Sequence, residues 1–384
     1  MRVVLAGPVL TSSLRTSLGL SLPEAPPGVA RSPVEPLAAA LRTAGHEVHV
    51  VTTEPTLHQP VTIAEADFSI TYCPLRGAPH YRARVRALDL FEAEIRHLTA
   101  AIRALAPDIV HAHWTYEFAE AALRSGHPHL VTMHDLGWGN LVHFRNPYRL
   151  MRLVMKYRTM WRVQHLTAVS PIVAGRAPLY GYFGKVDLVP NGVEIPSHLL
   201  PRSAADLARP VIVTVGDAGP LKNVRSSVRA FRSIRERFPE AELHLFGTGL
   251  DAAFAGGAPG VVAHGNTPHA ELMQFLAERA TLLVHPSRLE TFGVILAEAK
   301  VRGVPVIAGR RAGAVPYVCA DGVSRLVDIE APRQIAEGVL GLLADATAYA
   351  QARQRSREDV IERFSIAASA AGYMAVYQRV VGRP

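Results

Sequence analysis

The chain has 384 residues, which is long enough for two ordinary domains with separate hydrophobic cores. Apolar residues make up 49% of it and charged residues 19%, a composition typical of a folded globular protein rather than a disordered one. No run of eighteen apolar residues occurs, so no membrane-spanning helix is expected. Cys73 and Cys319 are too few for a disulfide framework or a zinc site, and they fit a reducing cytoplasm.

The positive charge of the chain is concentrated in one segment. The formal net charge is +8, and residues 136–186 contain no Asp or Glu. The remaining 33 basic residues are matched by 33 acidic ones, so a nucleic-acid partner is not expected. The segment itself contains eight basic residues: Arg145, Arg149, Arg152, Lys156, Arg158, Arg162, Arg176 and Lys185.

Short apolar runs alternate with helical patterns along the whole chain. Pro8 and the polar residues 11–13 interrupt the first run, which favours a buried strand over a secretion signal. In the first half, strands are predicted at 3–6, 48–51, 109–112, 130–133, 167–169 and 186–189, and helices at 36–43 and 90–105. In the second half, strands are predicted at 211–215, 242–246, 261–263, 282–285 and 304–307, and helices at 224–237 and 268–278.

This alternation predicts an α/β protein with parallel sheets covered on both faces. Residues 195–202 contain prolines without periodicity, which indicates a linker. We therefore expect two Rossmann-like, doubly wound domains, at 1–195 and 196–364, that face a cleft. Residues 365–384 are expected to form a helix that crosses back to the first domain, with apolar positions at Ala370, Tyr373, Met374 and Tyr377.

Two glutamates lie eight residues apart near the expected start of a helix that follows the strand at 282–285. Thr291 is expected to cap this helix, which would begin one or two residues later and turn backbone N–H groups toward a phosphate. Two glutamates at this spacing could accept hydrogen bonds from both ends of a nucleoside diphosphate sugar. The alternative is a surface helix with two solvated glutamates. The predicted donor contacts are Glu290, Thr291, Phe292, Gly293, Val294 and Glu298.

Lys222 lies in the loop between the strand at 211–215 and the next helix, with Gly216 and Asn223 nearby. In a doubly wound sheet such a loop faces the ligand, so we expect Lys222 to contact the diphosphate and the two neighbours to belong to the same binding loop. The alternative is an exposed surface lysine.

Several aromatic and histidine side chains are candidates for the acceptor side of the site. His134 follows the strand at 130–133 and could bond the donor sugar or the acceptor hydroxyl; the alternative is a structural histidine. His111 and His113 are expected to point to opposite faces of their strand, and no further ligands for a metal are evident. The predicted acceptor-side residues are His113, Trp114, Asp135 and Trp138, with Tyr116 as another aromatic that could stack on a sugar.

The basic segment reads as an amphipathic helix over 149–162 at about 100° per residue. A solvated basic face is favoured, and contact with anionic lipid or a phosphate-bearing acceptor is the alternative. The expected apolar side carries Leu150, Leu153, Val154, Tyr157 and Trp161, and the expected basic side carries Arg149, Arg152, Lys156, Arg158 and Arg162.

Motifs spread over nearly the whole chain resemble one enzyme family. They are GHEV at 45–48, PDIVHAH at 107–113, VTMHD at 131–135, AVS at 168–170, VPNGV at 189–193 and the E-x7-E stretch from Glu290 to Glu298 with its continuation GVPVIA at 303–308. Together they resemble the family 4 retaining glycosyltransferases, which have the GT-B fold.

The resemblance implies that a nucleotide sugar binds mainly the C-terminal domain and that the acceptor binds the N-terminal domain. It implies catalytic roles for His134, Glu290 and Lys222, with no metal or other cofactor, and transfer that retains the anomeric configuration as the leaving diphosphate deprotonates the acceptor hydroxyl. A UDP-sugar is the first expectation for the donor and GDP-mannose the second. The acceptor would be a glycan, a lipid-linked molecule or a small molecule, and the protein would be cytoplasmic, with peripheral contact with the membrane through residues 149–162 as one option.

The chain departs from the family at three places. Asp217 stands where an arginine is usual, and Tyr317 stands where a glutamate is usual. Gly28, which the resemblance implies is a donor-binding residue, alone remains of two usual glycines. These departures keep open a catalytically weakened GT-B protein that acts as a scaffold or binding protein. A sugar-nucleotide epimerase and, on the two glycines of residues 246–249, a nicotinamide oxidoreductase are further alternatives.

Overall fold

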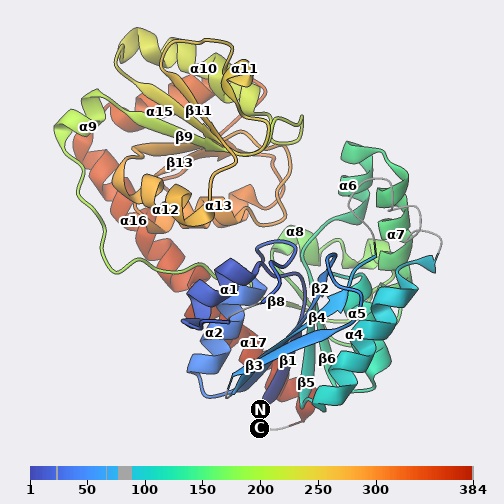
Figure 1. Cartoon of the computed structure of the whole chain (residues 1–384). Coiled ribbons are helices and arrows are strands. Elements are labelled where there is room, and N and C mark those ends of the chain that lie inside the picture. Colours follow the sequence, from blue (N-terminus) through green and yellow to red (C-terminus); the bar gives the residue numbers. More distant parts are fainter. Residues whose placement is uncertain (23–24, 66, 77–88, 383–384) are drawn as a thin grey trace. The chain divides into compact units, whose positions relative to one another are not determined.

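The computed structural model describes residues 1–22, 25–65, 67–76 and 89–382. Two compact units are present: Met1–Gly192 together with Ile366–Pro384, and Val193–Ser365. Each is built on a sheet covered by helices, as Figure 1 shows for each unit separately. The predicted fold class, two parallel-sheet α/β domains, is confirmed.

The first unit is built on a sheet with the strand order β3-β4-β2-β1-β5-β6-β7-β8. Among the strands that the structure describes, only β3 is antiparallel to its neighbour, and the order reverses direction at β1, whose neighbours are β2 and β5. The strands are β1 Arg2–Ala6, β2 Glu47–Glu54, β3 Val61–Glu65, β4 Phe68–Pro74, β5 Ile109–His113, β6 His129–Met133, β7 Leu166–Ala168 and β8 Val186–Leu188. All strands predicted in this half are present, whereas β3 and β4 were not predicted.

Helices cover this sheet, and the C-terminal helix α17 (Ile366–Val381) is one of them. Its residues Ala370, Tyr373 and Tyr377 belong to the same buried core as β1 and β2, because α17 packs on α2, β5 and β6. The other helices of this unit are α1 Thr11–Leu18, α2 Val34–Thr43, α4 Glu92–Leu105, α5 Glu117–Ser125, α6 Gly137–Phe144, α7 Pro147–Met160, α8 Pro171–Ala174 and the 3₁₀ helix η1 Ala177–Tyr180.

The second unit has an entirely parallel sheet with the order β11-β10-β9-β12-β13-β14, which reverses direction between β9 and β12. Its strands are β9 Val211–Val215, β10 Glu242–Phe246, β11 Val261–Gly265, β12 Leu282–His285, β13 Val306–Gly309 and β14 Arg325–Val327. Its helices are α9 Ala204–Ala208, α10 Val224–Arg237, α11 Ala252–Ala255, α12 His269–Glu278, α13 Val294–Val301, α14 Val315–Val318, α15 Pro332–Leu343 and α16 Ala346–Phe364. The short β14 was not predicted.

The expected faces of the basic helix are wrong in part: Leu153 is buried and Arg158 and Arg162 are exposed as predicted, but four other residues lie on the opposite side from the one expected. Leu150, Val154 and Trp161 are exposed by 53%, 48% and 75%, whereas Lys156 is completely buried. Acidic side chains of α5 and of the loop after β6 pair with basic residues of α7, which therefore face the protein interior. The sequence pattern of a single helix cannot show these counter-ions. Arg152 pairs with Glu117, and Lys156 Nζ lies 2.6 Å from Oδ1 of Asp135.

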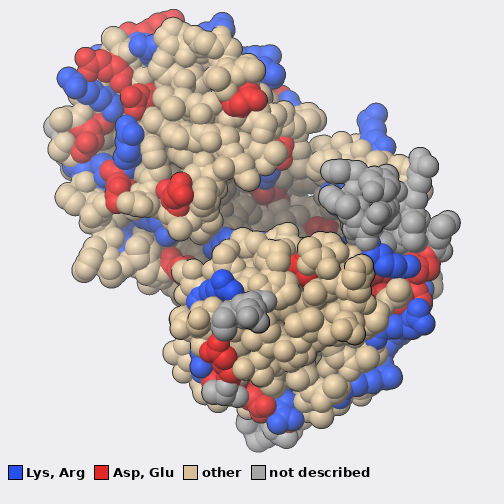
Figure 2. All heavy atoms as spheres, in the orientation of Figure 1, with Lys and Arg blue, Asp and Glu red and all other residues tan. Residues whose placement is uncertain are grey.

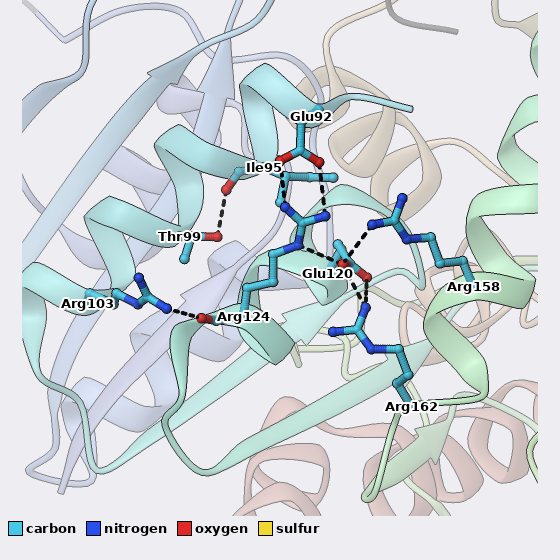
Figure 3. Close-up of polar contacts among 8 residues, drawn as sticks. All are labelled: Glu92, Ile95, Thr99, Arg103, Glu120, Arg124, Arg158 and Arg162. Carbon is cyan, nitrogen blue, oxygen red and sulfur yellow. Dashed lines mark hydrogen bonds and ion pairs between the residues drawn. The ribbon is translucent and has the colours of Figure 1, made fainter. Parts of the chain in front are cut away.

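The buried Glu120 of α5 is the centre of the largest of these pairings. Its carboxylate accepts hydrogen bonds from Arg124 and Arg162, and Arg158 lies 3.6 Å away, as Figure 3 shows. Arg124 also bonds both carboxylate oxygens of Glu92 on α4. Arg152 and Arg158 of α7 and Arg162 just after it therefore hold α7 to α5, while Arg124 holds α5 to α4.

Candidate functional site

The side chains of Lys222 and Glu290 meet at the place where the sheet of the second unit reverses direction. Lys222 follows β9 and Glu290 follows β12, and these two strands are neighbours. Lys222 Nζ lies 2.5 Å from Oε1 of Glu290, and Nε2 of His285 lies 2.9 Å from the same oxygen. Crevices beyond the carboxyl ends of strands at such a reversal are the usual ligand sites of doubly wound sheets.

Glu290 is ionised at neutral pH in this arrangement. Burial by itself would raise the pKa of its carboxyl, but the hydrogen bond from His285 and the charge of Lys222 outweigh burial and hold the pKa well below its usual value. Nδ1 of His285 is buried without a hydrogen-bond partner among the described residues, which fits an Nε2–H that donates to Glu290. A largely buried carboxylate next to one amine can accept hydrogen bonds from sugar hydroxyls.

Helix α13 begins later than predicted. Its N-cap is Gly293, with φ of +82°, and not Thr291. A glycine takes this left-handed conformation without the strain that a threonine would meet. The Phe292 side chain is buried against the ring of Phe364, so only its backbone can reach a ligand. Val294 is the first helical residue, and its N–H therefore belongs to the free N-terminal group expected to face a phosphate.

Glu298 lies inside α13, as predicted, and its side chain is nearly buried. Its Oε1 lies 2.8 Å from Nε2 of His269, the first residue of α12. His269 was not among the predicted site residues. The motif around Glu298 does not contain it, and only the packing of α12 on α13 brings the two together.

The loop after β9 is closely packed against its neighbours. A side chain on Gly247 would lie 1.6 Å from the carbonyl oxygen of Gly216, so both positions need the close approach that glycine allows. Asn223 is mainly structural: its amide donates to Ile329 O, and its side-chain oxygen accepts from Ser226. The position of Lys222 is therefore fixed by the backbone of this loop.

Three charged residues near this loop, Asp217, Arg288 and Arg311, differ in how their side chains are held. The carboxylate of the exposed Asp217 accepts a hydrogen bond from the N–H of Gly219 and so stabilises its own turn. Arg288 pairs with Glu330 and bonds the carbonyl oxygen of Pro220, which occupies its guanidinium. Arg311 is exposed, two residues before Gly313, whose turn is bonded to the backbone of Glu290.

The first unit gathers His113, Trp114 and His134 at the ends of β5 and β6. His113 Nδ1 lies 2.9 Å from Nε2 of His134, and the ring of Trp114 lies 4.5 Å from that of His134. Burial and nearby positive charge lower the pKa of His134 to about 3, so this imidazole is neutral at physiological pH. A neutral imidazole can donate or accept one hydrogen bond without carrying charge.

The expectation that His111 and His113 point to opposite faces is wrong. Their ring centroids are 4.2 Å apart, because residues two apart in a strand project to the same side. Both are completely buried. His111 bonds the hydroxyls of Tyr377 and Thr132, so it links β5 to β6 and α17. It is a structural histidine.

Asp135 anchors the loop that follows His134. Its carboxylate accepts hydrogen bonds from Tyr116, Asn140 and Lys156, and its backbone carbonyl also accepts from Lys156. Burial would raise the pKa of Asp135, but Lys156 and the hydrogen bonds lower it overall. Trp138 is 46% exposed and donates through Nε1 to Tyr157. Asp135 and Tyr116 thus hold the candidate site, while Trp138 offers an open aromatic surface.

Gly28 closes the loop that follows β1. Its φ is +79°, and a side chain there would lie 2.3 Å from the carbonyl oxygen of Val9. The N–H of Gly28 donates to the completely buried Glu54, and Glu35 holds Leu10 and Ser32 in the same way. These two acids were not predicted; their signal in the sequence is weak, because buried and exposed glutamates look alike.

Among the described residues, no group of three or more His, Cys, Asp or Glu side chains is placed to hold a metal ion. Both cysteines are free thiols and buried. Within the described ranges, none of the helices combines the length and the apolar character needed to cross a bilayer.

Solved structures share this architecture over the whole chain. A sucrose-phosphate synthase from Thermosynechococcus elongatus superposes with a TM-score of 0.77 at 19% identity, covering 100% of this chain and 99% of that one. An Anabaena protein, solved in complex with UDP and glucose, gives a TM-score of 0.65 at 14% identity, with 99% of this chain and 100% of that chain covered. The fold is therefore GT-B, the class of two Rossmann-like units found in many glycosyltransferases.

Family comparisons agree in both halves. Residues 28–195 match the family described as Glycosyltransferase Family 4, and residues 200–359 match Glycosyl transferases group 1. A D-inositol 3-phosphate glycosyltransferase of Segniliparus rotundus is 29% identical over 297 residues, which are 70% of this chain and 66%, just under two thirds, of that protein. The chain belongs to the family 4, group 1 glycosyltransferases.

Proposed function

We propose that this protein is a retaining glycosyltransferase that moves a sugar from a nucleotide diphosphate sugar to a hydroxyl acceptor without a metal ion. The observation that carries the proposal is the cluster of Lys222, His285 and Glu290 at the sheet reversal, with Glu298 further along α13. It combines an amine for the diphosphate with two carboxylates, the buried Glu298 and the largely buried Glu290, for sugar and ribose hydroxyls. The second unit would thus bind the donor.

In this proposal the protein contributes position and charge rather than a covalent intermediate. The bond between the anomeric carbon and the diphosphate oxygen breaks as the acceptor oxygen bonds that carbon on the same face. The departing diphosphate takes the proton of the acceptor, and Lys222 and the N–H groups at the start of α13 stabilise its growing negative charge. The neutral His134 would bond a sugar or acceptor hydroxyl without competing for the proton.

A UDP-sugar is our first choice of donor and GDP-mannose the second. The Anabaena protein of the same fold was solved with UDP and glucose, which supports the first choice. The anchoring of Asp217 within its own turn removes one objection to an active enzyme, because the acid need not face the diphosphate. Tyr317 packs against Arg363 and Phe364 within its own unit. The anchored Asp217 thus favours an enzyme over a scaffold protein that has lost activity, whereas Tyr317 has a packing role.

For the acceptor we propose a lipid-linked molecule at an anionic membrane surface on the cytoplasmic side. The loop after His134 leads directly into α6 and α7, whose outward side is apolar: Trp138, Val142, Phe144, Leu150, Val154 and Trp161 are each at least 46% exposed. Leu150, Val154 and Trp161 fall within about 40° of one another around α7. Arg145 and Arg149 lie beside them, and Arg149 stacks on the Phe144 ring at 4.8 Å. An apolar stripe flanked by cations and free of acids suits anionic lipid.

A panel of nucleotides and nucleotide sugars would test the donor assignment. Thermal unfolding of the purified protein should shift upward with one nucleoside diphosphate and its sugar, since ligands that bind the native state raise its stability. The same donor should then be hydrolysed slowly without an acceptor, in the presence of a chelator. A protein that binds the donor but never cleaves its glycosidic bond would favour the binding-protein alternative. Interconversion of the sugar while still on the nucleotide would favour the epimerase.

A further inference from the structure

Helix α10 carries a row of arginines on its outward side. Arg225, Arg229, Arg232 and Arg235 follow one another at helical spacing, while Phe231 and Ile234 face the core of the second unit. Like charges three or four residues apart destabilise a helix, and Arg225 lies in the first turn, where the helix dipole disfavours a cation. No acidic residue occupies that first turn.

These arginines line a cavity of about 700 Å³ that lies between α10 and α11. The opposite wall is Phe254 of α11 and the turn formed by residues 256–259. Basic side chains are visible over α10 and α11 at the upper edge of Figure 2. The volume is that of a pocket for a small organic ligand and is much larger than a single ion needs.

The positive charge of this cavity is not neutralised within the part of the chain that the structure describes. Arg225 lies over the ring of Phe254 at 4.5 Å, and Arg235 bonds the carbonyl oxygen of Pro239. Arg229 and Arg232 are exposed and form no recorded ion pair or hydrogen bond with described residues. The nearest acids along the two helices do not compensate: Glu236 forms no recorded ion pair there, and Asp251 caps α11 through the N–H of Phe254.

We propose that the α10–α11 cavity binds a small molecule that carries at least two phosphate groups. Guanidinium groups match phosphate oxygens with paired N–H donors, and a row of four can hold several phosphates at once. Phe254, which is half-buried and lies beneath the Arg225 guanidinium, gives the cavity an apolar wall against which the rest of the same ligand can pack. The lining contains neither Lys222 nor the carboxylates of the donor cluster, so this is a second site.

The test is a calorimetric titration with sodium tripolyphosphate and, separately, with ATP. It uses Lys222→Ala protein, in which the donor-site cation is absent, so that the second site is measured. We expect one saturable site that weakens by about tenfold or more in the Arg229→Ala/Arg232→Ala variant, as loss of charge-assisted hydrogen bonds predicts. Tighter binding of ATP than of tripolyphosphate would identify a nucleotide as the ligand, and equal binding would identify the phosphate chain alone.

The matched control is Arg237→Ala/Arg333→Ala, which removes two exposed charges of the same unit outside the cavity. It should bind both ligands within about twofold of the parent, because screened charges at a distance contribute little. Both variants replace exposed side chains, and their melting temperatures will show that they fold. Equal weakening by both variants, the absence of a saturable site, or binding only of a long polyanion such as heparin would overturn the proposal.

Discussion

Lys222 and Glu290 are separated by 68 positions in the chain, yet the amine of one lies 2.5 Å from a carboxylate oxygen of the other. This ion pair joins the amine that we propose for the diphosphate to the carboxylate that we propose for the sugar. In the proposed mode of binding, the diphosphate would compete with Glu290 for Lys222, and the sugar hydroxyls would compete with Lys222 for Glu290.

Glu290→Gln and Glu298→Gln should each weaken use of the donor. Loss of hydrogen bonds to a charged group costs about 1.5–3 kcal/mol, which is roughly a tenfold to hundredfold fall in kcat/KM. Steady-state kinetics of donor hydrolysis or transfer measures this. Glu337→Gln, on the exposed side of α15, is the matched control and should have parental kinetics. If both site variants have parental rates, Glu290 and Glu298 do not bind the donor as proposed.

Lys222→Ala should lower kcat more than it raises KM. The negative charge on the diphosphate grows as the glycosidic bond breaks, so a cation there stabilises the transition state more than the bound donor. The fall in kcat should be roughly tenfold to a hundredfold, and Lys222→Arg should recover part of it. A change confined to KM would mean that Lys222 only binds the ground state.

Asp135→Asn should strongly destabilise the first unit. The change leaves the completely buried amine of Lys156 without its counter-ion, and loss of one partner of a buried pair costs about 3–5 kcal/mol. Urea unfolding followed by circular dichroism measures it. Asp67→Asn, which breaks the exposed pair with Arg42, should leave the free energy of unfolding close to that of the parent. Adding Lys156→Met to Asp135→Asn should restore stability, because no unpaired charge remains buried; failure to do so would show that the pair is not the cause.

The stability of the protein should decrease as the pH falls below about 6.5. Burial lowers the pKa of His111, His113 and His134, the last to about 3 from an ordinary value of 6.5. Below pH 6.5 these histidines are protonated in the unfolded chain but not in the native state. Each of them therefore adds a slope of about 1.4 kcal/mol per pH unit to the free energy of unfolding.

Unfolding free energies between pH 7.5 and pH 5.5 should therefore show a smaller slope in His134→Asn than in the parent. The difference should approach one proton, about 1.4 kcal/mol per pH unit below pH 6.5. The exposed His58→Asn variant is the control for replacing a histidine by asparagine. An unchanged slope in His134→Asn would mean that His134 titrates alike in the folded and unfolded protein.

Leu150→Ser/Val154→Ser should abolish sedimentation with anionic vesicles, and Arg149→Ser should weaken it by about 1 kcal/mol, the usual contribution of one cation near such a surface. Hydrolysis of a soluble donor should be unaffected, because these residues are in the first unit. Ile361→Ser, which removes an exposed apolar residue from the second unit, is the matched control. If the parent protein does not sediment with anionic vesicles at low salt, the membrane proposal is contradicted.

The sequence predicted the strands near the candidate site because they are short, strongly apolar and followed by turn residues. It placed Lys222 and Glu290 correctly in the loops after β9 and β12. Their direct contact could not be foreseen, since it depends on which strands are neighbours in the sheet.

The errors arose where partners lie far along the chain. The orientation of α7 is decided by Glu117, Glu120 and Asp135, which a pattern confined to residues 149–162 does not contain. The start of α13 depended on a left-handed glycine, which competes with the more familiar threonine cap. In both cases local propensity gave way to tertiary contacts.

The hydrogen bond between His111 and Tyr377 has a consequence for biosynthesis. The core of the first unit includes α17, so residues 1–192 lack part of their interior until residues 366–381 have been made. Residues 193–365 form a contiguous unit that can fold earlier, as soon as it leaves the ribosome. The unit that is translated first is thus the one that is completed last, and it must remain competent to accept its final helix while its neighbour folds.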